Sequence, residues 1–231
     1  YGFWIMLRYA VSRATKDLRP WLIRTFLNTE AVAIFSVAVN ILTLAQDAFP
    51  MGMMSGLLPW EVNNPKRFRY IFVRAMKYTI WGGAAAGLIF AFAIPPVVGF
   101  VLPKYLPAMP LFQVLMLSLP LYGISRLYLA TLIALREQKI LTARTFTDVV
   151  ISVGTLTVFL PLAGLFAVAI ERWLNYSWRT FFYYNQLVKK YPFLRLHLSQ
   201  LLWFDEEDYV IFSRGVAETK TFIRSLAKRF K

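Results

Sequence analysis

Apolar residues occur in long runs separated by short polar connections. Six such runs cover residues 1–27, 31–59, 78–102, 108–135, 140–161 and 164–190. A helix needs about 20 mostly apolar residues to cross the hydrocarbon core of a bilayer. The pattern therefore predicts an all-α, polytopic membrane protein, in which residues 1–190 form a six-helix transmembrane bundle and residues 191–231 form a cytoplasmic amphipathic helical tail.

The last run is unusual because polar side chains recur at helical spacing along one side of it. These are Arg172, Asn175, Tyr176, Arg179, Tyr183 and Gln186. An arginine near the bilayer centre costs at least about 2.5 kcal/mol. We therefore expect this stripe to face water, a partner charge or an anionic ligand, with the other runs forming a wall around it.

The first run carries more charge than an ordinary membrane span. Arg13, Asp17 and Arg24 fall on nearly the same side of a helix, where the acid can partly neutralise the bases. We expect that side to line a cavity. An amphipathic helix lying on the membrane surface is the alternative for this run.

Three more charged residues lie near the middle of other runs, namely Asp47, Arg126 and Asp148. An unpaired carboxylate at that depth would be costly, so we expect Asp47 to face the protein interior. A structural ion pair with a neighbouring arginine is the alternative for Asp47. Asp148 shares one helical face with Thr145 and Ser152, which extends the polar stripe to a second helix.

The connection at 63–77 reads as a basic interfacial turn that leads into the run 78–102. That run contains Gly82, Gly83 and Gly87, small residues that allow two helix backbones to approach closely, and we expect it to pack against a neighbour.

The chain has a net charge of +14, a mean hydropathy of +0.52 and 58% hydrophobic residues. The basic residues concentrate at the ends of the apolar runs, which indicates membrane topology rather than nucleic-acid binding. Those on one side, which we expect to be cytoplasmic, are Lys66, Arg67, Arg69, Arg74, Lys77, Arg136, Lys139, Arg144, Lys189 and Lys190, whereas the other side offers little beyond Lys104.

The usual signatures of enzymes and of metal or cofactor sites do not occur in the sequence. The chain has no cysteine, a single histidine at position 197 and no glycine-rich phosphate loop. The run DEED at 205–208 points its carboxylates around a helix rather than to one point, so we expect no metal there. We predict that the protein is not an enzyme and uses neither metal nor cofactor, and that the tail binds anionic lipid or caps the bundle.

Bases exceed acids among the charges that the pattern places inside the membrane. The bases are Arg13, Lys16, Arg19, Arg24, Arg126, Arg172 and Arg179, and the acids are Asp17, Asp47, Asp148 and Glu171. If they line one cavity, guanidinium groups stay available for phosphate or pyrophosphate. The alternative is that the charges simply pair between helices.

Several stretches resemble polysaccharide flippases. These are NTEAVAIFSVAVNILTL at 28–44, LLPWEVNN at 57–64, LPKYLPAMPLFQVLMLSLPLYGISRLYLATLIALREQK at 102–139 and PLAGLFAVAI at 161–170. The family is the MOP superfamily, in particular its flippases for O-antigen and lipid-linked oligosaccharide. The resemblance implies two six-helix bundles around a central cavity and alternating access in the inner (plasma) membrane. This chain would supply one bundle, the C-terminal one, and its partner would be the missing N-terminal half.

The resemblance and the charge pattern together predict a transporter that moves a lipid-pyrophosphate-linked oligosaccharide across the membrane. The expected partners are membrane lipids around the bundle, and no nucleic acid is expected. The alternatives are a multidrug or cation exporter of the same superfamily and a membrane-embedded glycan polymerase or ligase. The predicted substrate-cavity residues are Arg13, Asp17, Arg24, Asp47, Arg126, Asp148, Arg172, Asn175 and Arg179.

Overall fold

The computed structural model describes residues 2–48, 56, 58–206 and 208–209, and all regular structure within these ranges is helical. The chain divides into two compact units, Tyr1–Arg195 and Leu196–Lys231. In the second unit the structure describes one short helix, α9 (Leu198–Leu202). Most of the predicted amphipathic tail, residues 210–231, lies outside the described residues.

The first unit contains seven α-helices and three short 3₁₀ helices among its described residues. The α-helices are α1 (Gly2–Phe26), α2 (Thr29–Ala48), α4 (Pro65–Val101), α5 (Met109–Met116), α6 (Leu119–Ala134), α7 (Gln138–Ala163) and α8 (Phe166–Lys190). The 3₁₀ helices are η1 (Leu58–Glu61), η2 (Pro103–Ala108) and η3 (Pro192–Leu194).

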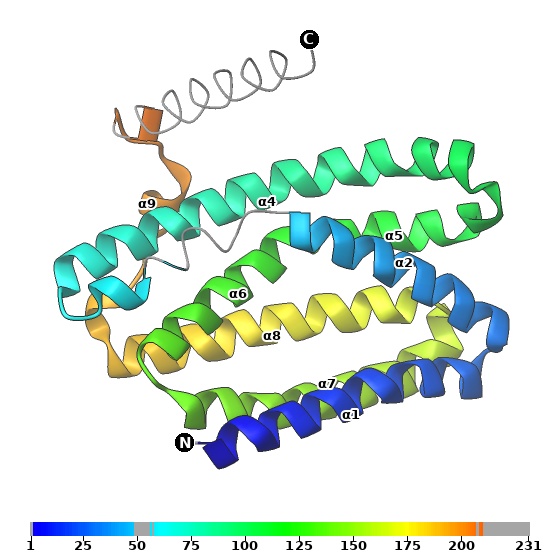
Figure 1. Cartoon of the computed structure of the whole chain (residues 1–231), viewed down its shortest axis with the longest axis horizontal. Coiled ribbons are helices and arrows are strands. Elements are labelled where there is room, and N and C mark those ends of the chain that lie inside the picture. Colours follow the sequence, from blue (N-terminus) through cyan, green and yellow to red (C-terminus); the bar gives the residue numbers. More distant parts are fainter. Residues whose placement is uncertain (1, 49–55, 57, 207, 210–231) are drawn as a thin grey trace, which may run out of the picture. The chain divides into compact units, whose positions relative to one another are not determined.

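The long helices lie side by side in the order α1, α7, α8, α6 and α4 (Figure 1). Helix α2 packs against α1 and α5. One apolar core lies between α2, α4 and α5 around Phe112 and Leu115, and a second lies between α1, α2, α7 and α8 around Ile23 and Leu160. Helix α8 therefore has α7 on one side and α6 on the other, which gives its polar stripe two neighbours.

Three helices, α2, α4 and α7, are long and apolar enough to cross a membrane. The segments Pro103–Met116 and Leu119–Ala134 pass the same test together, as one span bent by 55°. Helices α1 and α8 have 25 residues each but are too polar to be counted with them. By length and composition the described residues thus contain three spans, or four with the bent pair, where the sequence pattern predicts six.

The predicted interfacial turn at 63–77 is instead the beginning of α4, which runs for 37 residues. Asn64 caps it, since its side chain accepts a hydrogen bond from the backbone N–H of Arg67 at 3.3 Å, and Pro65 fills the first helical position. At 1.5 Å per residue the helix is about 55 Å long, well beyond the roughly 30 Å of a hydrocarbon core. The basic residues of this segment thus lie on a helix that continues past any bilayer that it crosses.

The predicted single span at 108–135 is broken at residues 117 and 118, where α5 gives way to α6. Helix α4 packs closely against this break. A Cβ atom on Gly87 would lie 2.9 Å from the carbonyl oxygen of Met116, and one on Gly83 would lie 3.0 Å from the Cα of Pro120. The predicted packing role of the small residues in α4 is therefore confirmed at these two positions.

Candidate functional site

One face of α8 holds a glutamate that is completely buried. The carboxylate oxygen Oε1 of Glu171 accepts hydrogen bonds from Arg19 of α1 at 2.9 Å, from Ser152 of α7 at 2.5 Å and from Asn175 at 2.9 Å. Asn175 also donates to the Ser152 hydroxyl at 2.9 Å. A buried carboxylate is tolerable only when it is paired and hydrogen-bonded. Glu171 therefore joins three helices, α1, α7 and α8, at one point.

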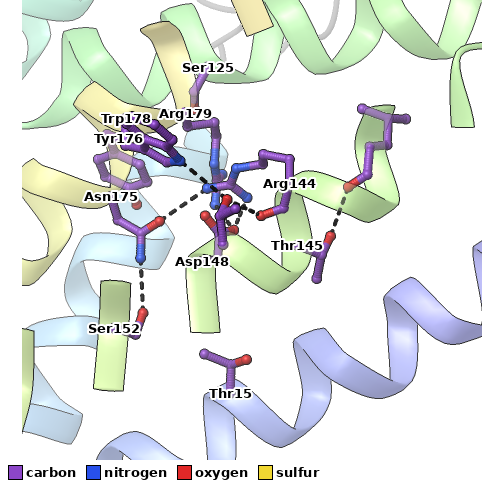
Figure 2. A network of polar contacts seen from close by, with 12 residues as sticks. Thr15, Ser125, Arg144, Thr145, Asp148, Ser152, Asn175, Tyr176, Trp178 and Arg179 are labelled. Atoms are coloured by element: carbon purple, nitrogen blue, oxygen red, sulfur yellow. Dashed lines mark hydrogen bonds and ion pairs between the residues drawn. The ribbon is translucent and has the colours of Figure 1, made fainter. Parts of the chain in front are cut away.

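A second carboxylate lies further along the same interface (Figure 2). Asp148 of α7 forms ion pairs with Arg144, one helical turn before it, and with Arg179 of α8 at 3.2 Å. Arg144 is only 4% exposed, and it also donates to the side-chain oxygen of Asn175 at 3.1 Å. Asn175 thus connects the Asp148 group with the Glu171 group.

We call these seven side chains the buried polar network: Arg19, Arg144, Asp148, Ser152, Glu171, Asn175 and Arg179. Three arginines face two carboxylates in it, so the network carries one excess positive charge. The second oxygens of Asp148 and Glu171 and the Nε atoms of the three arginines are buried without a hydrogen-bond partner. The network therefore keeps hydrogen-bonding capacity that its own members do not use.

Two further arginines lie where α8 faces α6, Arg172 on α8 and Arg126 on α6. Arg172 donates to the Tyr176 hydroxyl at 3.2 Å, and the Arg126 guanidinium lies 5.8 Å from the centre of the Tyr122 ring. The two tyrosine rings meet edge to face at 5.7 Å. Arg172 also interacts electrostatically with Glu171, the residue before it, although Glu171 forms its short ion pair with Arg19. We call Tyr122, Arg126, Arg172 and Tyr176 the guanidinium face.

The guanidinium face and the buried polar network share a boundary at Arg179. Its guanidinium lies 5.6 Å from the centre of the Tyr176 ring, while its Nη2 reaches Asp148. Two acids lie within electrostatic range of the guanidinium face, namely Asp47 of α2 at Tyr122 and Glu171 at Arg172. Positive charge therefore predominates where α8 meets α6.

The nine residues predicted from the sequence do not meet at one point. Asp148, Asn175 and Arg179 belong to the buried polar network, and Arg172 and Arg126 belong to the guanidinium face. Arg13 and Asp17 form a pair at 3.7 Å with side chains that are 83% and 73% exposed, and Arg24, Asp47 and Arg126 are exposed as well. The structure thus separates an inner group between α7 and α8 from an outer group on the surfaces of α1, α2 and α6.

The sequence pattern counts Arg144, near the beginning of the run 140–161, with the basic residues of the expected cytoplasmic side. The residue lies inside α7 and is buried against Asp148 and Asn175. Arg74 and Lys77 were counted in the same way and are likewise buried within α4. The spacing of four residues between Arg144 and Asp148 was the available signal, because such residues lie on one helical face.

A separate polar contact holds the end of α8 to the turn between α6 and α7. Glu137 accepts hydrogen bonds from the Tyr191 hydroxyl at 2.8 Å and pairs with Lys190 at 2.5 Å. Partial burial alone would raise the pKa of Glu137, but these two hydrogen bonds and the Lys190 charge hold the pKa below its usual value. Burial and the same contact raise the pKa of Tyr191.

No known family profile, curated protein or solved structure matches this chain. Its chemistry must therefore be judged from the side chains. The described residues contain no group of three or more His, Cys, Asp or Glu side chains that could hold a metal ion. They do contain more guanidinium groups than carboxylates where α8 meets α6 and α7, and these groups suit a phosphate or carboxylate because each can donate two parallel hydrogen bonds.

Proposed function

We propose that the chain is one six-helix bundle of a membrane transporter, composed of α1, α2, α4, the bent pair α5–α6, α7 and α8. Its cargo is a lipid-pyrophosphate-linked oligosaccharide, which it moves across the cytoplasmic membrane by alternating access together with a second bundle. The sequence resemblance to polysaccharide flippases and the apolar helices support this placement. So do large apolar side chains on the outer surface, among them Phe92 at 72%, Phe100 at 91% and Val150 at 72% exposure, which lipid would cover.

The guanidinium face is the observation that carries the proposal. Arg126 and Arg172 add two guanidinium groups beside a network whose two carboxylates already pair with three arginines, and the acid that interacts with Arg172, Glu171, is itself bound to Arg19. A pyrophosphate supplies the missing negative charge and presents oxygens that a guanidinium fork can bind two at a time. Tyr122, which is only partly buried, offers its ring to the first sugars of the glycan, while the buried Tyr176 supports it edge to face.

The buried polar network has a different task in this proposal. It ties α1, α7 and α8 together through Arg19, Glu171 and Asn175. Helices held in this way move as one body, as the rocking of a bundle in alternating access requires. The network then transmits movement at the guanidinium face to α1.

A multidrug exporter for cationic compounds is a weaker candidate. Such cargo needs carboxylates that are free to pair with it, whereas the two carboxylates of the buried polar network, Asp148 and Glu171, are both bound to arginines, which leaves Asp47 as the one exposed acid near the guanidinium face among the described residues. A glycan polymerase or ligase would use the same guanidinium groups on the same lipid pyrophosphate. Consumption of the donor glycan by purified protein, in place of its movement between leaflets, would favour that enzyme.

Transport by the full-length protein that contains this chain tests the proposal. The protein is reconstituted in proteoliposomes, and movement of a labelled polyprenyl-pyrophosphate oligosaccharide to the opposite leaflet is followed by its accessibility to a glycan-binding lectin. We expect Arg172→Gln to reduce the rate at least about tenfold, because a hydrogen bond to a charged group contributes roughly 1.5–3 kcal/mol. Arg172→Lys should restore only part of it, since an ammonium lacks the planar fork.

The matched control is Lys104→Gln, which removes an exposed positive charge in η2. It should transport at the unaltered rate. The proposal fails if the unaltered protein moves no lipid-linked oligosaccharide, or if Arg172→Gln transports as fast as Lys104→Gln.

A further inference from the structure

One end of the first unit carries far more positive charge than the other. The beginning of α4, the end of α6, the beginning of α7 and the end of α8 gather there (Figure 1). Contacts of η1 with α4 and α6, and of η3 with α4 and α8, hold this end together. The rings of Phe68 and Phe193, 6.5 Å apart, connect α4 to η3.

Six basic side chains at this end have no partner among the described residues, and we call them the basic end. They are Lys66, Arg69, Arg136, Lys139, Lys189 and Arg195. Two acids lie nearby and both are already occupied, since Glu61 pairs with Arg67 at 3.0 Å and Glu137 pairs with Lys190. The surface therefore presents a concentrated positive charge that nothing in the described chain neutralises.

The turn between α6 and α7 keeps one of these charges, Arg136, exposed. Arg136 has a backbone φ of 58°, a left-handed conformation that is uncommon for arginine, in the tight turn between α6 and α7. The next residue, Glu137, points back to α8 and fixes the turn. Arg136 is consequently exposed while its neighbour is anchored.

Aromatic side chains accompany the basic end. Trp60 in η1 is 85% exposed, and Tyr70 in α4 is 50% exposed. Exposed tryptophan and tyrosine beside lysine and arginine are typical of the level of lipid headgroups, where amphipathic rings sit between water and hydrocarbon. The opposite end differs, since the end of α1, the beginning of α2 and η2 carry Arg24, Glu30 and Lys104 respectively and so have little net charge.

We propose that the basic end binds the phosphate headgroups of acidic phospholipids in the membrane leaflet that it faces. We rest this on the membrane placement proposed above and not on the identity of the cargo. The occupant is a lipid and not a soluble anion because the charges form a broad band around the ends of four helices, accompanied by aromatic side chains. Each lysine or arginine near an anionic surface strengthens binding by about fivefold, which is about 1 kcal/mol.

Two double variants with equal charge loss test the proposal. Lys66→Gln with Arg136→Gln removes one lysine and one arginine from the basic end, and Lys104→Gln with Arg24→Gln removes one of each from the opposite end. The full-length protein in detergent micelles receives phosphatidylglycerol and phosphatidylcholine with identical acyl chains, and native mass spectrometry counts the lipids that each variant retains. All four positions are exposed, so circular dichroism should show unaltered helix content.

We expect the unaltered protein to prefer phosphatidylglycerol, and the basic-end variant to bind it about 30-fold more weakly. The opposite-end variant should keep the preference for phosphatidylglycerol. Added salt should weaken this preference in the unaltered protein and in the opposite-end variant. Equal retention of the two lipids by the unaltered protein, or an equal loss in both double variants, would overturn the proposal. Tighter binding of a short single-stranded DNA than of phosphatidylglycerol would overturn it in favour of nucleic acid. A protein that retains no lipid at all would instead refute the membrane placement itself.

Discussion

Two ion pairs in this chain have the same four-residue spacing, but one is exposed to solvent and the other is buried. Replacing the aspartate of each pair therefore measures how much burial changes the contribution of an ion pair to stability. Arg13 and Asp17 are one helical turn apart on α1, with side chains 83% and 73% exposed. Arg144 and Asp148 are one turn apart on α7, with side chains only 5% and 13% exposed. Asp148 also pairs with Arg179, so its loss leaves one buried and one partly buried guanidinium group without their acid.

Removing one partner of a buried ion pair costs about 3–5 kcal/mol, whereas an exposed pair of this spacing contributes about 0.3–0.5 kcal/mol. For a chain of this size each kcal/mol lowers the Tm by roughly 2–4 °C. We therefore expect Asp148→Asn to lower the Tm by about 10 °C and Asp17→Asn to lower it by no more than about 2 °C.

Tryptophan fluorescence of the detergent-solubilised protein during heating gives both Tm values, and the chain supplies seven tryptophans for it. High salt should reduce the small effect at Asp17 further and leave the larger effect at Asp148 almost unaltered, because a buried pair is poorly screened. Equal shifts for the two variants would refute our account of the buried polar network, and so would a larger shift for Asp17→Asn.

The other predictions concern helix packing and pH. Gly87→Ala should lower stability by about 1–3 kcal/mol, because the new methyl group would lie 2.9 Å from the Met116 carbonyl oxygen. Gly154→Ala, where a Cβ atom meets nothing within 4 Å, should leave the Tm unaltered or raise it. Equal Tm values for the two variants would contradict the close approach of α4 to α5. Glu137 has a folded-state pKa below its ordinary 4.5, so its pair with Lys190 stabilises the protein above about pH 4.5 and that contribution is lost as the pH falls. The Tm difference between the unaltered protein and Glu137→Gln should accordingly shrink below pH 4.5, and a difference that grows there would show that the sign is wrong.

The helical nature of the chain and most helix positions follow from the sequence, because long apolar runs and their polar connections determine both. Helix ends were harder to predict where a proline in the first helical turn competes with another local pattern. Asn64 followed by Pro65 is a typical helix start, yet the basic residues after it suggested a turn. Pro120, in the first turn of α6, marks the break from α5 in the same way.

The candidate site was less predictable because its contacts join residues far apart in the sequence. The stripe on α8 could be recognised from its spacing, but its partners could not. Arg19 and Glu171 are separated by 152 positions, and Arg144 and Asn175 by 31. Counting the basic residues at the ends of apolar runs did not reveal the partners of Arg144, because such a count takes no account of pairing between helices.

Cysteine accessibility in intact membranes tests the central claim most directly, namely that the guanidinium face lies in a water-filled path for a lipid-linked anion. This chain contains no cysteine, so single replacements can be made once any cysteines elsewhere in the protein are removed. Arg126 is exposed at the guanidinium face, and Val150 is 72% exposed on the apolar surface of α7. A membrane-impermeant thiol reagent should label Arg126→Cys and not Val150→Cys, and lipid-linked oligosaccharide should suppress the labelling. Equal labelling at both positions, or labelling of Arg126→Cys that the lipid-linked oligosaccharide does not alter, would contradict the account.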